Sequence, residues 1–294
     1  MIFAAIADWA DAGEFPVEFM CQQLGVSRSG YYAWRTRPVS HRKLTDIDLT
    51  SRIRRIHQQG RGNPGVRRVR AGLAAEGIRC GLARIHRLMQ AAGLQGRHPK
   101  AWRRTTIAGA KPVSAPDLIG RNFTAPAPDK AWCGDITYIR TWTGWVYLAT
   151  VIDCCTKQVL GWSMAPHMRT DLICDALTMA ATRQPLAPGA IFHSDRGTQY
   201  TSTQFAKHLE SLGIVGSMGR TGVCWDNAMA ESFFAALKNE LVYRVVLPTR
   251  KKARRLIAEY IEVFYNRTRI HSGIGYKTPA QVALEYQQHK SEAA

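Results

Sequence analysis

The sequence of 294 residues lacks any long apolar run, and no stretch approaches the roughly 18 residues that a membrane-spanning helix requires. Its first ten residues, MIFAAIADWA, lack a basic start and are interrupted by Asp8, so they do not resemble a secretory signal. These absences exclude an integral membrane protein. They predict a cytoplasmic protein with no membrane partner.

Cysteine is present in a pattern that does not suit disulfides or structural zinc. The seven cysteines form an odd set without a C-x-x-C pair, and Cys154 and Cys155 are adjacent, which is a poor arrangement for two ordinary bridges. We therefore expect reduced thiols. No internal repeat and no low-complexity tract is present either.

Acidic residues are scarce, and the resulting charge is unevenly distributed. The chain has 40 Lys and Arg against 22 Asp and Glu, a net charge of +18 and a pI near 10.0. Residues 51–125 carry 16 basic and 2 acidic side chains, 241–294 carry 10 and 4, and 126–240 carry 9 and 10. Such a field favours a polyanion, either nucleic acid or an anionic membrane surface. The two basic segments would hold a phosphate backbone, while the near-neutral middle segment would have a role other than phosphate binding.

The first 45 residues predict a helical segment. Residues 17–35 read as two short helices joined by Leu24-Gly25-Val26, with Ser27 as the N-cap of the second helix. This spacing is typical of a helix-turn-helix. An ordinary helical hairpin is the alternative interpretation.

Residues 46–97 predict a second, strongly basic helix-turn-helix domain. Apolar residues recur at helical spacing in two helices within 63–97, so that each helix has one buried stripe. The arginines fall mostly off these stripes, and they are candidates for phosphate contact: Arg67, Arg68, Arg70, Arg84 and Arg87. A merely solvated face is the alternative.

The remaining chain divides into a linker, an α/β domain and a tail. Residues 98–129 combine Pro, Ala, Gly and basic residues without periodicity, which is typical of a linker. Residues 131–164 predict three strands in an antiparallel meander, followed by helix, strand, helix, strand and a long helix over 226–242, capped by Asp226 or Asn227. This order predicts an α/β domain with a mixed sheet over 130–245, followed by a basic helical tail over 246–294.

Three acidic residues occupy positions from which they could converge. Asp135 lies inside the first strand of the meander, Asp195 ends the fourth strand, and Glu231 lies in the first turns of the long helix. Like charges brought within a few ångströms repel, so they need cations or raised pKa values. Hard oxygen ligands suit Mg²⁺ or Mn²⁺, and two such ions would support phosphodiester chemistry.

Four stretches carry a family resemblance: WCGDITYI, HSDRGTQYTS, DNAMAESFFAALKNEL and YNRTRIHSGIGYKTPAQVA. Together they resemble the second-frame (OrfB) product of insertion-sequence transposases of the IS-three type, relatives of retroviral integrase. The likeness covers roughly residues 50–285. It implies a ribonuclease-H-like core, an N-terminal helix-turn-helix region, and a D,D(35)E triad consisting of Asp135, Asp195 and Glu231, with 35 residues between the last two.

The resemblance also implies neighbours of the triad. It points to Lys238, two turns beyond Glu231 on the same helix face, as a contact to the end of the transposon DNA, and it places Arg103 and Arg104 among the DNA-binding residues. Four residues beside the triad would position DNA or orient carboxylates, with structural packing as the alternative: His193, Gln199, Tyr200 and Asn227.

Other conspicuous residues have simpler interpretations. Asp153 is read as a turn residue, and Trp132, Trp145 and Trp162 as core aromatics rather than base-stacking platforms. Arg269 and His271 in the closing motif either touch phosphate or pin the last helix.

The expected activity is DNA transposition, in which transposon ends are nicked and the freed 3′-hydroxyl is joined to a target. The expected cofactor is two Mg²⁺ or Mn²⁺ ions. The expected partners are double-stranded DNA carrying terminal inverted repeats, target DNA, and a second copy of the chain, since two DNA ends must meet. When bound to DNA, the protein would be associated with the bacterial nucleoid.

Relatives commonly work as a fusion with an upstream frame (OrfA) that supplies a leucine zipper, and this chain has no sustained heptads. The alternatives are a DNA-binding regulator or decayed transposase without catalysis, and a structure-directed nuclease with the same core.

Overall fold

The structure is a computed structural model that describes residues 2–97, 116–120, 122–184, 186–219 and 227–292. The chain divides into two compact units, Met1–Ile53 and Arg54–Ala294. Among the described residues, no helix combines the length and apolar character needed to cross a membrane.

The first unit is a small helical bundle. It contains α1 (Ile2–Asp11), α2 (Val17–Gln23), α3 (Arg28–Thr36) and the part of α4 (His41–Gln59) that extends to Ile53. Ile6, Met20 and Tyr31 are buried at its centre. The hydroxyl of Ser27 accepts a hydrogen bond from the Gly30 amide at 2.9 Å, which confirms Ser27 as the N-cap of α3.

The second unit begins with the end of α4 and two basic helices, α5 (Val66–Ala75) and α6 (Leu82–Ala91). The predicted apolar stripes are buried at Val69, Leu73 and Ile85, whereas Leu82 at the start of α6 is 37% exposed. At Gly72 a Cβ would lie 2.9 Å from the Ile56 side chain, so α4 and α5 approach closely.

A five-stranded mixed sheet forms the centre of the second unit, as the sequence predicts. The strands are β1 (Ala131–Thr141), β2 (Gly144–Asp153), β3 (Val159–Ala165), β4 (Ile191–Ser194) and β5 (Val215–Met218), in the spatial order β3-β2-β1-β4-β5. The first three form the expected antiparallel meander. β4 pairs in parallel with β1, and β5 in parallel with β4.

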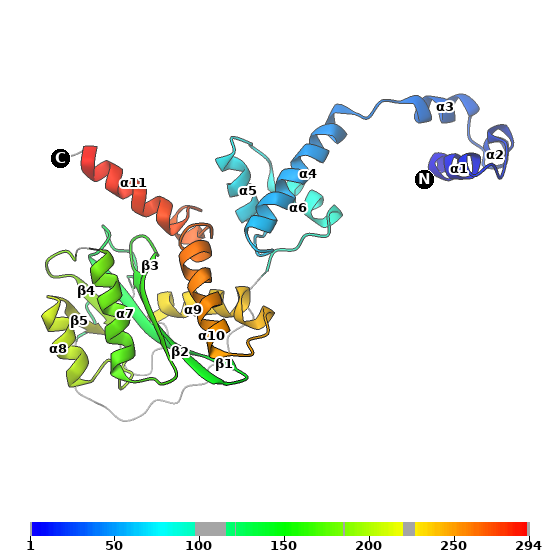
Figure 1. The fold of residues 1–294 in the computed structure, drawn as a ribbon. Helices are drawn as coiled ribbons and strands as arrows, with labels where there is room; N and C mark the ends of the chain where they lie inside the picture. The colour runs from blue at the N-terminus through cyan, green and yellow to red at the C-terminus, as the bar shows by residue number, and fades with distance from the viewer. Residues whose placement is uncertain (1, 98–115, 121, 185, 220–226, 293–294) are drawn as a thin grey trace. The chain divides into compact units, whose positions relative to one another are not determined.

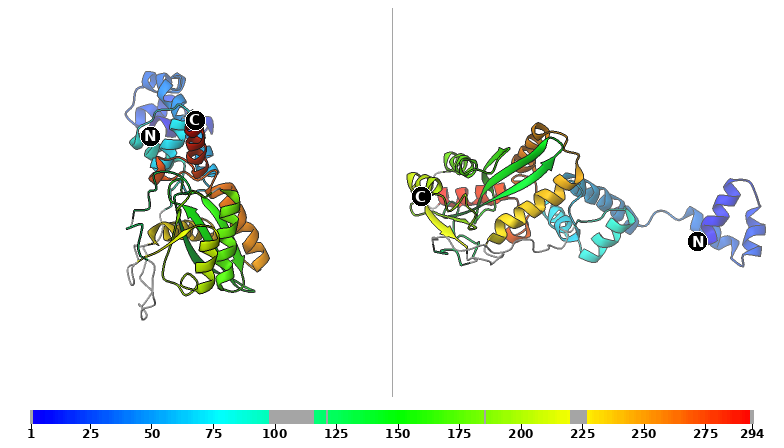
Figure 2. Two further views of the ribbon diagram at one scale, coloured as in Figure 1. Left: turned by 90° about the vertical axis from the view of Figure 1, so that its left-hand side faces the viewer. Right: turned by 90° about the horizontal axis from the view of Figure 1, so that it is seen from below.

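Helices cover both faces of the sheet (Figure 1). One face packs against α7 (Thr170–Arg183) and α8 (Thr203–Ser211), where Trp132, Ile173 and Phe205 share a buried cluster. The other face packs against α9 (Ala228–Glu240) and α10 (Arg250–Glu259), where Ile139 and Phe233 share a second cluster. In the right-hand view of Figure 2, α9 runs beside the long hairpin formed by β1 and β2. Strands with apolar side chains on both faces are typical of a sheet covered on both sides.

Gly134 allows β4 to pack tightly against β1. A Cβ at this position would lie 2.3 Å from the ring of Phe192, which is buried on β4. Because glycine has no side chain, the Phe192 ring can lie directly against Gly134, which immediately precedes Asp135. The parallel pairing runs from Ala131↔Ile191 to Cys133↔His193.

The end of the chain wraps around the second unit. After α10 the helix continues as a π-helical turn (Tyr260–Tyr265), followed by α11 (Pro279–Glu292). Of the predicted linker, residues 98–115 lie outside the described residues. The described part, 116–120 and 122–129, hydrogen-bonds to the sheet, with the amide of Leu118 donating to Ser217 Oγ and that of Asp129 to the Asp153 carboxylate.

The three tryptophans and Asp153, which are interpreted from the sequence as core and turn residues, differ in how far they are buried. Trp132 is buried, and Trp162 is half-buried with its indole N–H donating to Glu262 at 2.7 Å. Trp145 is 41% exposed, so the prediction that it belongs to the core is wrong. It lies at the tip of the hairpin, which extends past the buried clusters. Asp153 is the buried last residue of β2, directly before the predicted turn, and its carboxylate accepts hydrogen bonds from the amides of Asp129, Cys155 and Thr156.

Candidate active site

Asp135 lies in the middle of β1, on the face covered by α9. It is half-buried, and its carboxylate accepts a hydrogen bond from the amide of Ile136 at 2.7 Å. Thr150 is its partner across the antiparallel pair, so both side chains point to the same face. Burial raises the pKa of Asp135 well above its usual range, the negative charges of Asp195 and Glu231 raise it further, and the ammonium of Lys238 lowers it.

Asp195 follows β4 directly. The last residue pair between β1 and β4 is Cys133↔His193, and Asp135 and Asp195 each follow two residues later on their own strand. The charge of Asp195 acts on Asp135, so the two acids lie close enough to interact. The amide of Gly197 donates to Asp195 Oδ1 at 2.9 Å. Desolvation by the surrounding chain raises the pKa of Asp195, although its side chain reaches solvent, and the hydrogen bond from Gly197 lowers it.

Glu231 and Lys238 are presented by α9. Glu231 lies in the first turn of the helix and is exposed, and desolvation together with the charge of Asp195 raises its pKa. Lys238 lies two turns further along and is half-buried, so that desolvation lowers its pKa while Asp135 raises it. Three acids and one lysine therefore interact electrostatically, one acid from the central strand β1, one from the end of β4, and Glu231 and Lys238 from α9.

Unpaired oxygens surround this group of acids. The Thr150 hydroxyl, the Tyr200 hydroxyl and Asn227 Oδ1 are buried and have no hydrogen-bond partner among the described residues. A donor set of carboxylates and neutral oxygens fits a hard divalent cation such as Mg²⁺ or Mn²⁺. In the described part of the chain, however, no three His, Cys, Asp or Glu side chains gather closely enough to hold one metal ion. Convergence of Asp135, Asp195 and Glu231 on a shared ion therefore stays a prediction.

The four predicted supporting residues have different surroundings. Tyr200 is buried against Phe192 and Phe205, and burial followed by the charges of Asp135 and Asp195 raises its pKa. Gln199 donates to the carbonyl of Met168 at 3.0 Å. His193 is buried, with Nδ1 2.9 Å from Ser217 Oγ and its ring against Phe123, which are the contacts of a packed core histidine.

Asn227 stands at the start of α9 but does not cap it. Asn227 occupies the predicted N-cap position, but its side chain makes no capping hydrogen bond, and the alternative cap Asp226 lies outside the described residues. Instead, Asn227 Nδ2 donates to the carbonyl of Gly134 at 3.2 Å. This contact ties the start of α9 to the strand that carries Asp135.

The predicted DNA-binding arginines are not equivalent. Arg67, Arg70 and Arg87 are exposed and Arg84 is half-buried, whereas Arg103 and Arg104 lie outside the described residues. Arg68 differs from the DNA-contact prediction, because its guanidinium is partly buried 4.0 Å from the Glu240 carboxylate. Burial, followed by the charge of Arg269, lowers the pKa of Arg68.

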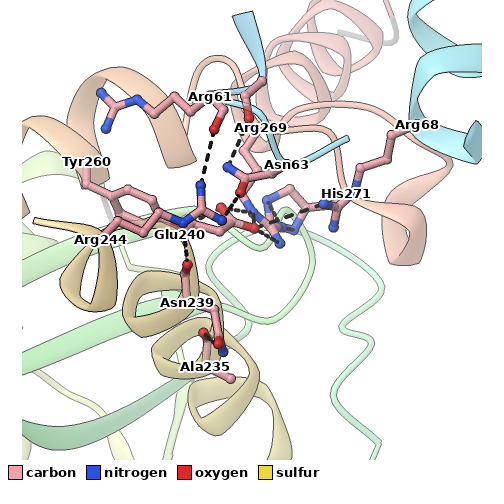
Figure 3. A network of polar contacts seen from close by, with 11 residues as sticks. Arg61, Asn63, Arg68, Ala235, Asn239, Glu240, Arg244, Tyr260, Arg269 and His271 are labelled. Carbon is pink, nitrogen blue, oxygen red and sulfur yellow. Dashed lines mark hydrogen bonds and ion pairs between the residues drawn. The ribbon is translucent and has the colours of Figure 1, made fainter. Parts of the chain in front are cut away.

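Glu240, the last residue of α9, is the centre of a buried polar network that the sequence did not predict (Figure 3). Arg269 Nη2 donates to Glu240 Oε1 at 2.9 Å and Arg269 Nε to Oε2 at 3.0 Å, while the hydroxyl of Tyr260 donates to Oε2 at 2.8 Å. Of the two interpretations of Arg269, these contacts favour the one in which it pins the chain. We refer to this set of contacts as the Glu240 network.

Arg244 and Arg61 connect the Glu240 network to the basic helices. Arg244 donates to the side chain of Asn63 and to the carbonyl of Arg61 from one side, and to the carbonyl of Asn239 in α9 from the other. Arg61 pairs with Glu259 at 2.9 Å. The end of α9 is thus joined to the loop that precedes α5.

His271 completes the network as a neutral group. Its ring packs edge-on against Tyr265 at 4.7 Å, and Arg269 Nη1 lies 3.3 Å from its ring nitrogens. Desolvation, followed by the charge of Arg269, lowers the pKa of His271 to about 3. A neutral imidazole can accept a hydrogen bond from the guanidinium, which a protonated ring cannot.

Family models match most of the chain. An HTH-like domain matches residues 43–102, and two models described as integrase core domain match residues 125–224 and 212–279. Among solved structures, the fold is similar to a simian T-cell lymphotropic virus intasome (TM-score 0.46, 15% identity, 72% of this chain and 69% of that chain). It is also similar to the HTLV-2 integrase catalytic core domain in complex with magnesium (TM-score 0.41, 17% identity, 53% of this chain and 97% of that chain).

Curated relatives are similar over nearly the whole chain. A 31 kDa protein of insertion element IS600 from Shigella sonnei is 39% identical over 92% of this chain and 99% of its own length. The transposase InsF of insertion sequence IS3A from Escherichia coli K12 is 37% identical over 91% and 94%. The transposase of element IS904 from Lactococcus lactis is 38% identical over 79% and 91%. The integrase core models and these relatives thus define a polynucleotidyl transferase with an integrase core. This chain belongs to the IS3 family of insertion-sequence transposases.

Loss of the Glu240 carboxylate should destabilise the second unit strongly. Replacing Glu240→Ala leaves the buried guanidinium of Arg269 without its partner, and we expect the free energy of unfolding in urea to fall by about 3–5 kcal/mol. As a control, Glu285→Ala breaks the exposed ion pair with Lys277 and should change the value by less than about 1 kcal/mol. Equal losses in the two variants would contradict the role of the Glu240 network.

His271 should make stability depend on pH in the acid range. Its pKa is about 3 in the folded chain against an ordinary 6.5, so between these values the unfolded chain binds a proton that the folded chain does not. The stability contributed by neutral His271 is present above pH 6.5 and is lost as the pH falls towards 3, with a slope of up to about 1.4 kcal/mol per pH unit. Urea unfolding of His271→Gln between pH 7 and pH 4.5 should show a shallower slope than the unchanged chain. An unaltered slope would show that His271 is not the group responsible, and the exposed His289→Gln serves as the control.

Proposed function

We propose that this transposase cuts transposon ends and joins them to target DNA with Asp135, Asp195 and Glu231 as its catalytic carboxylates. The observation that carries the proposal is the electrostatic interaction among Asp135 on β1, Asp195 directly after β4 and Glu231 on α9. Burial, followed by the charge of Asp195, raises the pKa of Asp135, and a bound cation would offset the repulsion between the acids.

The three acids would hold two divalent cations, Mg²⁺ or Mn²⁺. When bound, such ions supply charge stabilisation to the attacking and leaving oxygens of a phosphodiester exchange. Thr150, Tyr200 and Asn227 offer further oxygens beside the acids. Asn227 also donates to the Gly134 carbonyl, and Tyr200 also packs against Phe192, so their substitution would affect the positions of the acids.

Each step exchanges one phosphorus–oxygen bond for another. In the first, the oxygen of water attacks the phosphorus at the transposon end and the 3′-oxygen of the strand leaves as a hydroxyl. In the second, this 3′-hydroxyl attacks a phosphodiester of the target and expels its 3′-oxygen. No covalent bond to the protein is needed, so the protein contributes positioning and electrostatic stabilisation. Lys238 would hold a backbone phosphate beside the carboxylates.

DNA would be held by the basic segments. The exposed arginines Arg67 and Arg70 on α5, with Arg84 and Arg87 on α6, would contact phosphates of the terminal inverted repeat. Target DNA would lie against the catalytic face. Because two transposon ends must be processed together, we expect a dimer or larger assembly on DNA. A partner from an upstream frame (OrfA), separate or fused, would add a further DNA-binding region.

Loss of either exposed acid should abolish catalysis without abolishing DNA binding. With a labelled terminal-repeat duplex and Mg²⁺, we expect Asp195→Asn and Glu231→Gln to lower both nicking and strand joining by about 100-fold or more. Glu210→Gln, which changes an exposed acid on α8, is the matched control and should retain activity. Cleavage that persists in these variants, or that is indifferent to a chelator, would refute the assignment. Nicking without joining by the unchanged chain would favour a nuclease.

Adjacent arginines on α5 should differ in their effect on DNA affinity. Arg67→Ala removes an exposed cation and should weaken duplex binding, reducing the slope of log affinity against log salt by about 0.9. Arg68→Ala should leave this slope unchanged and instead lower stability, because Arg68 lies beside Glu240. Fluorescence anisotropy at several salt concentrations distinguishes them. The opposite pattern would show that Arg68 is the DNA contact.

A further inference from the structure

An exposed group of aromatic rings and cations lies next to the catalytic acids. Tyr138 on β1 is 59% exposed, and Trp145 on β2 is 41% exposed. Their rings meet edge to face, with centroids 5.3 Å apart and an angle of 86° between planes. We refer to Tyr138, Trp145 and the two cations beside them, Arg140 and Lys238, as the aromatic platform.

Each ring of the aromatic platform has its own cation. The Lys238 ammonium lies 5.5 Å from the centroid of Tyr138, and the Arg140 guanidinium lies 5.8 Å from the centroid of Trp145. Arg140 and Trp145 are direct partners across the hairpin. Cations at this distance are attracted by the ring faces, and in exposed positions the attraction is weak. The rings therefore keep the cations near the surface without neutralising them.

The edge of β1 at the aromatic platform is open among the described strands. β4 pairs with β1 only from Ala131 to Cys133, so the stretch from Gly134 to Thr141 has a strand neighbour on the β2 side alone. Tyr138 lies on this open stretch, three residues beyond Asp135. At about 3.3 Å per residue, the two residues are roughly 10 Å apart along the strand, and their side chains leave it on opposite faces. Lys238, which interacts with both, connects them across the open edge of β1.

Lys238 belongs to both groups. Its charge interacts with Asp135, and its ammonium also lies over Tyr138. A DNA strand that passes Lys238 would therefore cross the open edge of β1 on its way from the carboxylates to the aromatic rings. Exposed aromatic rings beside cations are typical of surfaces that bind single-stranded nucleic acid, in which bases stack and phosphates meet positive charge.

We propose that the aromatic platform binds an unpaired nucleotide of the DNA strand that reacts at Asp135, with the base against Tyr138 and Trp145 and the flanking phosphates beside Lys238 and Arg140. This inference rests on the proposed function of the acids. Duplex DNA fits less well, because the faces of its bases are hidden within the stack. A second copy of the chain fits less well too, since it would bring the same cations against each other. The platform thus favours a DNA end whose strands have separated.

The test measures binding in a chelating buffer, so that no DNA is cut. The full chain is titrated against a short duplex with an unpaired thymidine tail at one 3′ end, and against the blunt duplex of the same sequence. We expect the tail to tighten binding by about 10-fold, as stacking of one or two bases does. Tyr138→Ala should remove most of this gain and leave blunt-duplex affinity unchanged, whereas Tyr138→Phe, which keeps the ring, should retain the gain.

Trp142 provides the matched control. It lies in the same hairpin and is 78% exposed, so Trp142→Ala removes an aromatic ring that is not part of the platform and should preserve the effect of the tail. An equal loss in Trp142→Ala, or no gain from the tail in the unchanged chain, would overturn the proposal.

Sedimentation of the same variants adds a second readout. A change in self-association in Tyr138→Ala with an unchanged effect of the tail would identify the surface as a contact between copies and refute the stacking role. Failure of the unchanged chain to bind even the blunt duplex would instead refute the proposed function.

Discussion

The parallel pairing of β1 with β4 is the contact on which the site depends. It lasts for only three residue pairs, ending at Cys133↔His193, and both strands then leave the shared ladder. The two acids that follow lie close enough to interact at the point where the pairing ends. Gly134 and Phe192 make this possible, because the missing side chain on one strand accommodates the ring on the other. A site at the carboxyl end of a parallel strand is the usual place for a ligand in an open α/β sheet.

α9 provides the second constraint, because the acidic side chains at its two ends differ in how far nearby cations compensate their charge. Near its start, Glu231 joins two other acids. Among the described residues these acids have no guanidinium partner, and Lys238 is the cation that acts on Asp135. At its end, about 13 Å along the helix axis, Glu240 is saturated by Arg269 and Tyr260. The end at which Glu240 has its hydrogen-bond partners holds the helix in place. The end at which the acids lack such partners attracts cations. The arrangement suits an enzyme that acts on a polyanion.

The local features of the site could be predicted from the sequence because they depend on short-range patterns. Neighbouring residues alone indicate a strand that ends in Asp195 before Arg-Gly. They also indicate a long helix that begins shortly before Glu231. The Glu240 network could not be predicted, since Arg269 lies 29 residues beyond Glu240 and Asn63 lies 181 residues before Arg244. The contact between Arg68 and Glu240 could not be predicted for the same reason: helical spacing identifies a polar face but does not say whether that face meets solvent or another element. Trp145 was predicted to belong to the core, whereas it pairs with Arg140 beside the turn between β1 and β2 and is 41% exposed.

The most direct test of the account is a crystal structure of the chain bound to transposon-end DNA and Mn²⁺, in which anomalous scattering locates the ions. The account predicts Mn²⁺ within about 2.3 Å of carboxylate oxygens of Asp135 and Asp195, with Glu231 completing the site. Ions found elsewhere on the protein, with these three carboxylates directed away from the scissile phosphate, would contradict it.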